Sequence, residues 1–274
     1  MYDPSIVHFA ELAREKSEAA KANPLAFIVG AMLAGAYIGI AMILALTVGS
    51  GLDASIRPAV MGGVFGIGLI LTVFAGAELF TGYAMYLSFG LARRTVRISE
   101  AIRTLLMVWI GNFLGALLLV ALFYAASEAL LSSGAIALNA YASHKVDADV
   151  ITLLARGILC NWLVCLALWT ATRVQGDAAK CIILGWVLMT FVACGFEHSV
   201  ANMTALPLGL LTPTPTIHLL DAAKNLFFVT IGNVLGGMIA VAGAYLIAAR
   251  TDTHATEAQH DTGPLPTQLR TSKQ

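Results

Sequence analysis

Two stretches of sequence decide the fold: FAGAELFTGYAMYLSFGL at residues 74–91 and FVACGFEHSVANMTALPLGL at residues 191–210. Each stretch is apolar but is interrupted by one glutamate, Glu78 in the first and Glu197 in the second, and Gly-Leu follows each glutamate after twelve residues. A charged group at the centre of a bilayer is costly, so an acid inside a membrane-crossing segment marks a place where the helix breaks. The two stretches therefore predict two related broken spans.

The composition of the whole chain indicates an integral membrane protein. Of its 274 residues, 58% are hydrophobic and 12% are charged, with a mean hydropathy of +0.81. A soluble domain carries about 25% charged residues. At about 20 apolar residues per helical span, the chain has room for six spans and none for a large soluble catalytic domain. Because sixteen Lys and Arg balance sixteen Asp and Glu, no net field is present that would hold a nucleic acid.

The other spans are read from uncharged or nearly uncharged runs. The expected spans are 23–49, a broken 58–92, 105–127, 150–172, a broken 181–211 and 225–249. Residues 1–22 alternate apolar and charged groups at helical spacing, which predicts an amphipathic helix that lies on the membrane surface or is solvated. The polar tail at 251–274 is too poor in apolar groups to fold, so we expect it to be disordered, with the six-span domain at 23–250.

The third and sixth spans repeat each other. VWIGNFLGALLLVALFY at residues 108–124 matches VTIGNVLGGMIAVAGAY at residues 229–245 at a constant offset of 121. Each half holds three spans, and because three is odd the second half enters the membrane from the opposite side. The predicted fold class is an all-α integral membrane protein with six transmembrane helices in two inverted three-helix repeats, whose second and fifth spans are broken. Such repeats are typical of pores and transporters.

The positive charges predict the orientation. Twelve Lys and Arg residues fall on segments that alternate to one side of the membrane, and four fall on the other side. Cytoplasmic loops carry the excess of Lys and Arg, so both termini are expected in the cytoplasm. The four on the other side are Arg57, Lys145, Arg156 and Lys224.

A histidine lies directly in the second break. His198 follows Glu197 and is the only histidine within a predicted span. An imidazole there can donate a hydrogen bond to a passing anion or lend it a proton, because its charge changes near neutral pH. The alternative is a structural role in which the ring bonds free backbone groups of the broken helix. Thr81, in the first break, offers a hydroxyl across the pseudo-symmetry axis.

The breaks favour the binding of an anion, and their interrupted backbone needs side chains that stabilise it. Each break exposes a half-helix N-terminus, whose N–H groups carry partial positive charge. We assign structural roles at the breaks to Glu78, Glu197 and Asn202. Asn161 and Asn233 either bond helix to helix or face the pore. Large apolar side chains flank both breaks and are candidates for water-excluding constrictions: Phe65, Leu69, Leu79, Phe80 and Phe191.

Metal, disulfide and enzyme chemistry find little support in the sequence. The four cysteines lie in apolar spans without CxxC spacing or clustered histidines, so we expect no metal and no cofactor. No Ser-His-Asp order, phosphate-binding loop or paired-carboxylate motif is present. The one acid–histidine pair is adjacent in sequence and has no nucleophile arranged beside it.

Four motifs carry a resemblance to a known family. AELFTG (77–82), CNWLVCLALW (160–169), GFEHSVANM (195–203) and VTIGN (229–233), in this order, resemble the formate/nitrite transporter family. CNWLVCLALW and GFEHSVANM look most like its nitrite-channel branch. Members of the family have an aquaporin-like fold, assemble as pentamers with one pore in each protomer, and pass small monovalent anions such as formate, nitrite or hydrosulfide.

The resemblance implies roles for individual residues. His198 corresponds to the central pore histidine and Thr81 to the threonine of the first break. Lys145 stands where the family has a vestibule lysine, which would raise the local anion concentration. Asn161 and Asn233 fall on asparagine positions of the family, and the five apolar candidates fall at its two constrictions.

We therefore expect a bacterial inner-membrane channel or transporter for small monovalent anions, nitrite foremost, with proton coupling through His198. Its expected partners are the anion, the lipid bilayer and further copies of the chain in a pentamer, with no nucleic acid. The alternatives within transport are a formate or hydrosulfide channel and a neutral-solute channel for water, ammonia or glycerol. From other classes, the alternatives are a structural or sensory subunit with a vestigial pore and an intramembrane enzyme using Glu197 and His198.

Overall fold

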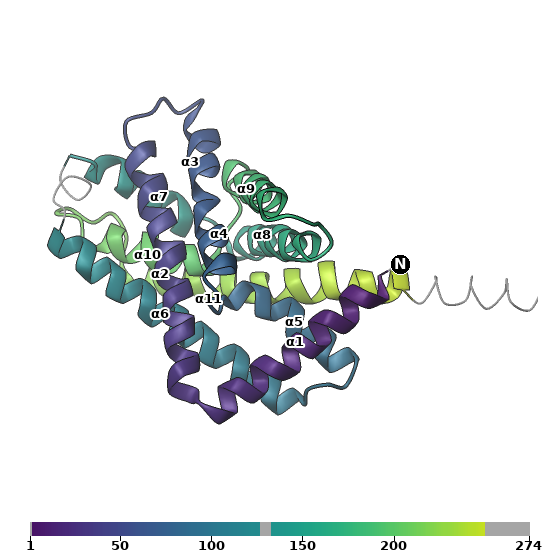
Figure 1. Cartoon of the computed structure of the whole chain (residues 1–274). Helices are drawn as coiled ribbons and strands as arrows, with labels where there is room; N and C mark the ends of the chain where they lie inside the picture. The colour runs from purple at the N-terminus through teal and green to yellow at the C-terminus, as the bar shows by residue number, and fades with distance from the viewer. Residues whose placement is uncertain (1, 127–132, 250–274) are drawn as a thin grey trace, which may run out of the picture.

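The computed structural model describes residues 2–126 and 133–249, and the regular elements in these ranges are all helices. They run in a bundle with several short helices ending inside it (Figure 1). The first repeat contains α1 (Asp3–Ala22), α2 (Pro24–Gly49), α3 (Arg57–Phe65), α4 (Ile67–Phe74), α5 (Phe80–Ala92) and α6 (Ile98–Ala126). The second contains α7 (Ala135–Val146), α8 (Val150–Ala171), α9 (Asp177–Ala193), α10 (Ser199–Leu210), α11 (Leu219–Leu235) and the π-helical segment η1 (Gly236–Gly243).

The broken-span architecture is confirmed. Within residues 2–126 and 133–249, five helices are long and apolar enough to cross a membrane: Pro24–Gly49, Arg57–Phe74, Ile98–Ala126, Val150–Ala171 and Leu219–Ala249. The predicted fifth span is divided between α9, of 17 residues, and α10, of 12 residues. The predicted second span is divided between α3–α4 and α5, with a second interruption at Gly66 that was not predicted.

Some helix ends differ from the predicted ones. The third span begins seven residues earlier than expected, at Ile98, and the sixth begins at Leu219, six residues earlier. Both extensions carry charged residues, and a helix can continue past the apolar core into the polar interface at little cost. The predicted third-span end at Ser127, the domain end at Arg250 and the predicted disordered tail lie outside the described residues.

The two breaks have the same backbone construction. Gly76 and Gly195 have φ values of +75° and +70°, a left-handed conformation that glycine adopts without penalty. After each glycine, a backbone N–H reaches back to a carbonyl of the preceding helix: Ala77 to Thr72 and Phe196 to Phe191, both at 2.9 Å. This is the Schellman pattern of a helix C-terminus. The chain then extends through the glutamate and starts a new half-helix.

A peripheral helix accompanies each repeat. The predicted N-terminal helix is present as α1, which packs along α5 (Figure 1) and buries Ile6, Phe9 and Ala13 almost completely. Stacked aromatic contacts fix this face, since the Phe9 ring lies 5.2 Å from that of Tyr86 and 5.8 Å from that of Trp169. The second peripheral helix, α7, was not predicted from the sequence, and it packs against α10 and α11.

Candidate functional site

Two cavities enter the bundle from opposite ends. One, of about 190 Å³, is bordered by α7 and the second break, and we call it the α7-side cavity. The other, of about 310 Å³, is bordered by α1 and the first break, and we call it the α1-side cavity. The two ends of α9 contribute to different cavities, Lys180 to the α1-side cavity and Val192 to the α7-side cavity. The cavities therefore lie at opposite ends of α9.

Cationic side chains outnumber anionic ones along both cavities. Arg57 and Lys145 line the α7-side cavity with one acid, Glu197. Lys16 and Lys180 line the α1-side cavity, again with one acid, Glu78. With all of these groups charged, each cavity has a net positive lining, which raises the local concentration of anions.

His198 lies at the inner end of the α7-side cavity and is 2% exposed. It is the N-cap residue of α10, and its Nδ1 accepts a hydrogen bond of 3.1 Å from the backbone N–H of Ala201. A ring nitrogen that accepts carries no proton, so the neutral imidazole has its hydrogen on Nε2. This nitrogen lies 3.4 Å from Thr81 Oγ1. The predicted pair across the pseudo-symmetry axis is thus brought together.

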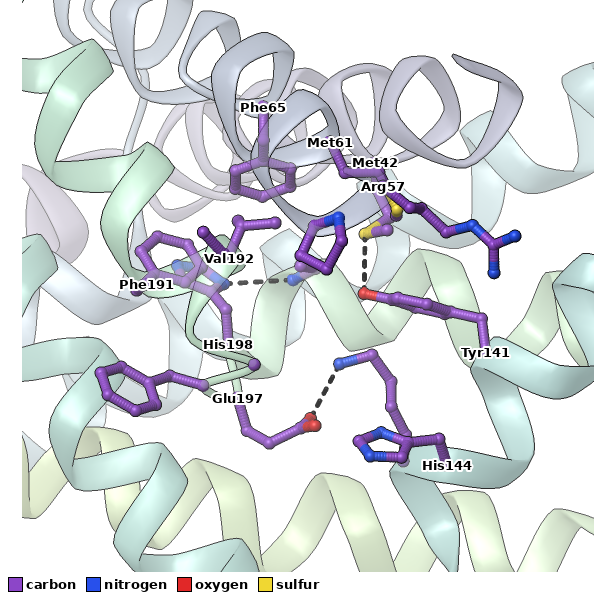
Figure 2. Close-up of a pocket in the computed structure, with 16 residues that line it drawn as sticks. Met42, Arg57, Met61, Phe65, Tyr141, His144, Phe191, Val192, Glu197 and His198 are labelled. Atoms are coloured by element: carbon purple, nitrogen blue, oxygen red, sulfur yellow. Dashed lines mark hydrogen bonds and ion pairs between the residues drawn. The ribbon is translucent and has the colours of Figure 1, made fainter. Parts of the chain in front are cut away.

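Apolar side chains surround this junction on both sides. The Phe191 ring stacks on the imidazole of His198, with 5.7 Å between the ring centres (Figure 2). It meets the Phe65 ring edge-on, with 5.6 Å between the ring centres. Leu69 and Leu79 line the α1-side cavity. Phe80 is also buried, but it lines neither cavity, and its backbone N–H is bonded to Asn112.

Asn112 and Asn233 brace the two breaks in the same way. Asn112 Oδ1 accepts from Phe80 N–H at 2.9 Å, and its Nδ2 donates to the carbonyls of Glu78 and Ala31. Asn233 makes the corresponding bonds. Its Oδ1 accepts from Ser199 N–H at 2.8 Å, and its Nδ2 donates to the carbonyls of Glu197 and Gly157. The amide of Asn233 therefore bonds two backbone groups of the break and one carbonyl of α8. These bonds satisfy polar groups that would be costly in an apolar environment.

Each break glutamate has a lysine partner on the peripheral helix of its own repeat. Lys145 Nζ lies 3.0 Å from Glu197 Oε2, and Asn202 Nδ2 donates to the same oxygen at 2.7 Å (lysine–glutamate pair in Figure 2). In the first break, Lys16 Nζ lies 2.6 Å from Glu78 Oε1, and the hydroxyl of Tyr83 donates to Oε2 at 2.8 Å. Tyr83 and Asn202 each stand five residues after their glutamate.

Lys145 is 6% exposed although it lies outside the predicted spans. Burial is the largest single influence and lowers its pKa, but the Glu197 carboxylate and Tyr141 together raise the pKa by more, so the net pKa lies above the ordinary value. The ammonium group also lies 5.0 Å from the centre of the Tyr141 ring. Lys145 is therefore charged at every physiological pH.

Asn161 connects the first break to the last span. Its Nδ2 donates at 3.0 Å to the carbonyl of Thr81 and also to the carbonyl of Asn233. Asn161, Asn233 and Lys145 are among the residues predicted from the sequence, whereas the contributions of Lys16 and Tyr83 were not predicted. Residues 1–22 were predicted only as an amphipathic helix, and no sequence signal linked Lys16 to Glu78.

The next feature is the arrangement of the His, Cys, Asp and Glu side chains within the described ranges. No group of three or more His, Cys, Asp or Glu side chains comes together there in a way that could hold a metal ion. The cysteines are free: Cys160, Cys165, Cys181 and Cys194.

Comparison with known proteins identifies the family of the chain. The sequence profile of the family described as Formate/nitrite transporter matches residues 7–247. The chain belongs to the formate/nitrite transporter family. The match covers both breaks and every candidate residue named above, so the resemblance drawn from the four motifs is confirmed.

Relatives within the formate/nitrite transporter family are described as transporters or channels. The chain is 40% identical to the nitrite transporter NirC of Escherichia coli over 227 residues, 82% of this chain and 84% of the relative. It is 34% identical to the formate channel FocA of Escherichia coli, over 89% of this chain and 95% of the relative.

Two solved structures share the fold. A structure titled as an FNT family ion channel matches with a TM-score of 0.87 and 38% identity, over 90% of this chain and 99% of that chain. A pentameric formate channel with formate bound matches with a TM-score of 0.74 and 28% identity, over 84% of this chain and 99% of that chain. The predicted fold class is thereby confirmed.

Proposed function

We propose that the protein conducts small monovalent anions, nitrite foremost, across a membrane. The observation that carries the proposal is the contact between His198 Nε2 and Thr81 Oγ1. His198 lines the α7-side cavity, and Leu79 and Tyr83, on either side of Thr81 in the chain, line the α1-side cavity. A hydrogen-bond donor and a hydroxyl at this place can replace part of the water that an anion loses on entry. The similarity to the nitrite transporter NirC, greater than that to the formate channel FocA, supports nitrite as the substrate.

The proposed path passes through five regions that differ in polarity. An anion enters the α7-side cavity beside Lys145, passes Phe65 and Phe191, and pauses at the His198–Thr81 junction. It then passes Leu69 and Leu79 into the α1-side cavity. The apolar residues exclude hydrated ions, because shedding a full hydration shell between apolar side chains is costly.

A proton accompanies the anion in this proposal. A bare anion would be strongly disfavoured between the apolar rings, whereas the neutral acid would not. His198 donates through Nε2, and taking up a proton at Nδ1 would cost the bond from Ala201 that starts α10. The resting imidazole is therefore neutral and does not itself supply the proton. The proton comes from the water of the entry cavity, joins the anion beside His198, crosses with it as the neutral acid and is released with the anion on the far side.

The proposal includes an assembly and an orientation. The pentameric formate channel supports a homopentamer with one pore in each protomer, and the bacterial relatives support the inner membrane. The excess of Lys and Arg near the α1 side supports cytoplasmic termini, which makes the α1-side cavity the cytoplasmic one.

The experiment is a flux assay with purified protein in liposomes. Nitrite, formate and chloride are offered in turn at equal concentration, with internal anion and pH followed by fluorescent indicators. We expect saturable nitrite flux, slower formate flux and chloride flux no greater than that of empty liposomes. Free permeation of water or ammonia without nitrite flux would instead support a neutral-solute channel.

A further inference from the structure

In both repeats the first span packs against the last span through equivalent contacts. The residues of the first span differ in type between the repeats at two of the corresponding positions. Residues of α2 and α8 correspond at an offset of 126, since Ala31 O and Gly157 O receive the equivalent bonds of Asn112 and Asn233. At this offset, Gly35 of α2 corresponds to Asn161 of α8, and Gly39 corresponds to Cys165. The second repeat therefore has two hydrogen-bond donors where the first has two glycines.

In the first repeat, Gly35 allows close helix contact. A Cβ atom at Gly35 would collide with the carbonyl oxygen of Asn112 on α6. In the second repeat, Asn161 occupies the equivalent place and donates to the corresponding carbonyl, that of Asn233. A full asparagine side chain needs space that the first repeat does not have.

The last span provides this space through its π-helical segment. The third span is α-helical throughout Ile98–Ala126, whereas the sixth is π-helical at Gly236–Gly243. At the offset of 121 between these spans, Ala116 corresponds to Gly237. A Cβ atom at Gly237 would lie 3.0 Å from Asn161 Nδ2, 3.0 Å from Cys165 Sγ and 2.9 Å from Ala84 Cβ. A π-helical turn is rare and often marks a functional position.

Both donors are directed at one acceptor across the pseudo-symmetry axis. Asn161 Nδ2 donates to the carbonyl oxygen of Thr81 at 3.0 Å, and Cys165 Sγ donates to the same oxygen at 3.3 Å. Asn161 Oδ1 also lies 3.5 Å from Cys165 Sγ. Thr81 is completely buried, so the two bonds and the packing of Gly237 fix its backbone.

We propose that Asn161, Cys165 and the π-helical turn at Gly237 form a positioning device that sets the place of the Thr81 hydroxyl relative to His198. The proposal rests on the proposed anion function, because it assigns the three residues to the geometry of the same junction. Asn161 then acts through Thr81, since its amide group is spent on backbone carbonyls. The asymmetry between the repeats places this device on the Thr81 side alone.

The test compares two glycines of the same π-helical segment. Gly237→Ala inserts a methyl group against both donors, whereas a Cβ atom at Gly243 meets only Met238 O of its own helix, at 3.4 Å. Nitrite and formate flux are measured in liposomes for both variants and for Gly237→Ala combined with Cys165→Ser. The serine is smaller at the contact and keeps a donor for Thr81.

We expect Gly237→Ala to lower nitrite flux by about tenfold and to change the nitrite-to-formate ratio, because a misplacement of about 1 Å at a site has large effects. Gly243→Ala should stay within about twofold of the wild-type flux, and the added Cys165→Ser should restore at least a third of the flux lost. Wild-type flux and an unchanged ratio in Gly237→Ala would overturn the proposal. So would a loss of flux with an unchanged ratio and no rescue.

A second readout does not depend on transport. In a chain whose Cys160, Cys181 and Cys194 are replaced by alanine, the infrared S–H stretching band reports on Cys165 alone. We expect the band to move to higher frequency in Gly237→Ala, as the bond to Thr81 is lost, and to stay in place in Gly243→Ala. An unmoved band in Gly237→Ala would contradict the proposal even if no anion is transported, which separates its failure from that of the proposed function. If Gly237→Ala does not fold, Asn161→Ala in the same background must move the band.

Discussion

His198 Nε2 and Thr81 Oγ1 lie 3.4 Å apart, although 117 residues separate them in the chain and they belong to opposite halves of the inverted repeat. Each stands near the start of a half-helix that begins after a break, α10 for His198 and α5 for Thr81. Because Nδ1 accepts from Ala201 N–H, the Nε2–H group points its hydrogen toward the hydroxyl. This junction is the place where an anion would exchange water for protein.

The hydroxyl at position 81 can be tested apart from the volume of the side chain. Thr81→Val keeps the shape and removes the hydroxyl, whereas Thr81→Ser keeps the hydroxyl. A hydrogen bond is worth about 1 kcal/mol, so we expect Thr81→Val to lower the nitrite flux by about five- to tenfold. Thr81→Ser should stay within about twofold of wild type. Equal flux in both variants would mean that the hydroxyl does not meet the anion.

The pair of Lys145 and Glu197 is predicted to act as a unit. Glu197 is 1% exposed, so Lys145→Ala leaves a buried carboxylate without its cation, which is strongly unfavourable. We expect a loss of nitrite flux of at least about tenfold. The double variant Lys145→Met with Glu197→Gln should be less impaired than the product of the single effects predicts. Independent effects, measured in a double-mutant cycle on flux, would show that the two groups are not coupled.

Lys145 is also predicted to contribute nothing to the pH dependence of flux between pH 5 and pH 9. The Glu197 carboxylate holds its pKa above the ordinary lysine value of about 10.4. The stabilisation from the pair is therefore complete below that value and is lost only as pH rises through the higher pKa of the folded state. Lys145→Arg, which is charged at all these pH values, should keep the wild-type pH profile. A profile that flattens in this variant would contradict the assignment.

Asn112 and Asn233 are predicted to contribute similar stability. Each makes two hydrogen bonds to the backbone of its break and one to a carbonyl of a neighbouring helix, and losing a buried partner costs about 1–3 kcal/mol for each group left unpaired. Asn112→Ala and Asn233→Ala should both lower the melting temperature of the detergent-solubilised protein by several degrees. Thr190→Val, at an exposed position, serves as the control. A large effect in only one of the two asparagine variants would argue against equivalent braces.

The apolar constriction formed by Phe65 and Phe191 on the α7 side is predicted to set the size of the largest anion that can pass. Phe65 and Phe191 are both buried and meet edge-on. Phe65→Ala should admit monoanions larger than nitrite, such as acetate, at several times the wild-type rate in the liposome assay. Trp186→Ala, at an outward-facing position of α9, should leave the size limit unchanged. Unchanged exclusion of acetate in Phe65→Ala would place the constriction elsewhere.

The sequence predicted features that depend on local pattern or on the repeat. The two acids in apolar runs predicted the breaks, and Gly76 and Gly195 supply the left-handed turns that end the helices before them. The three-span repeat predicted the meeting of Thr81 and His198. Each of these inferences needed only spacing and the cost of polar groups in lipid.

Features that depend on long-range contacts were missed. Lys16 pairs with Glu78 over 62 positions of sequence, and no local pattern specifies such a partner. The sequence of α7 is only moderately apolar and no helix was predicted there, because its burial against α10 and α11 comes from tertiary packing. The π-helical turn at Gly237 also depends on its neighbours, because Asn161 takes up a carbonyl of the last span.

The most direct measurement follows nitrite uptake and internal pH together in liposomes that hold the wild-type protein or His198→Asn. We predict nitrite flux with one proton carried per anion for wild type, and at least about a tenfold lower flux with altered pH dependence for the variant. Equal nitrite flux and an equal proton ratio in both proteins would contradict the claim that the anion passes the His198–Thr81 junction.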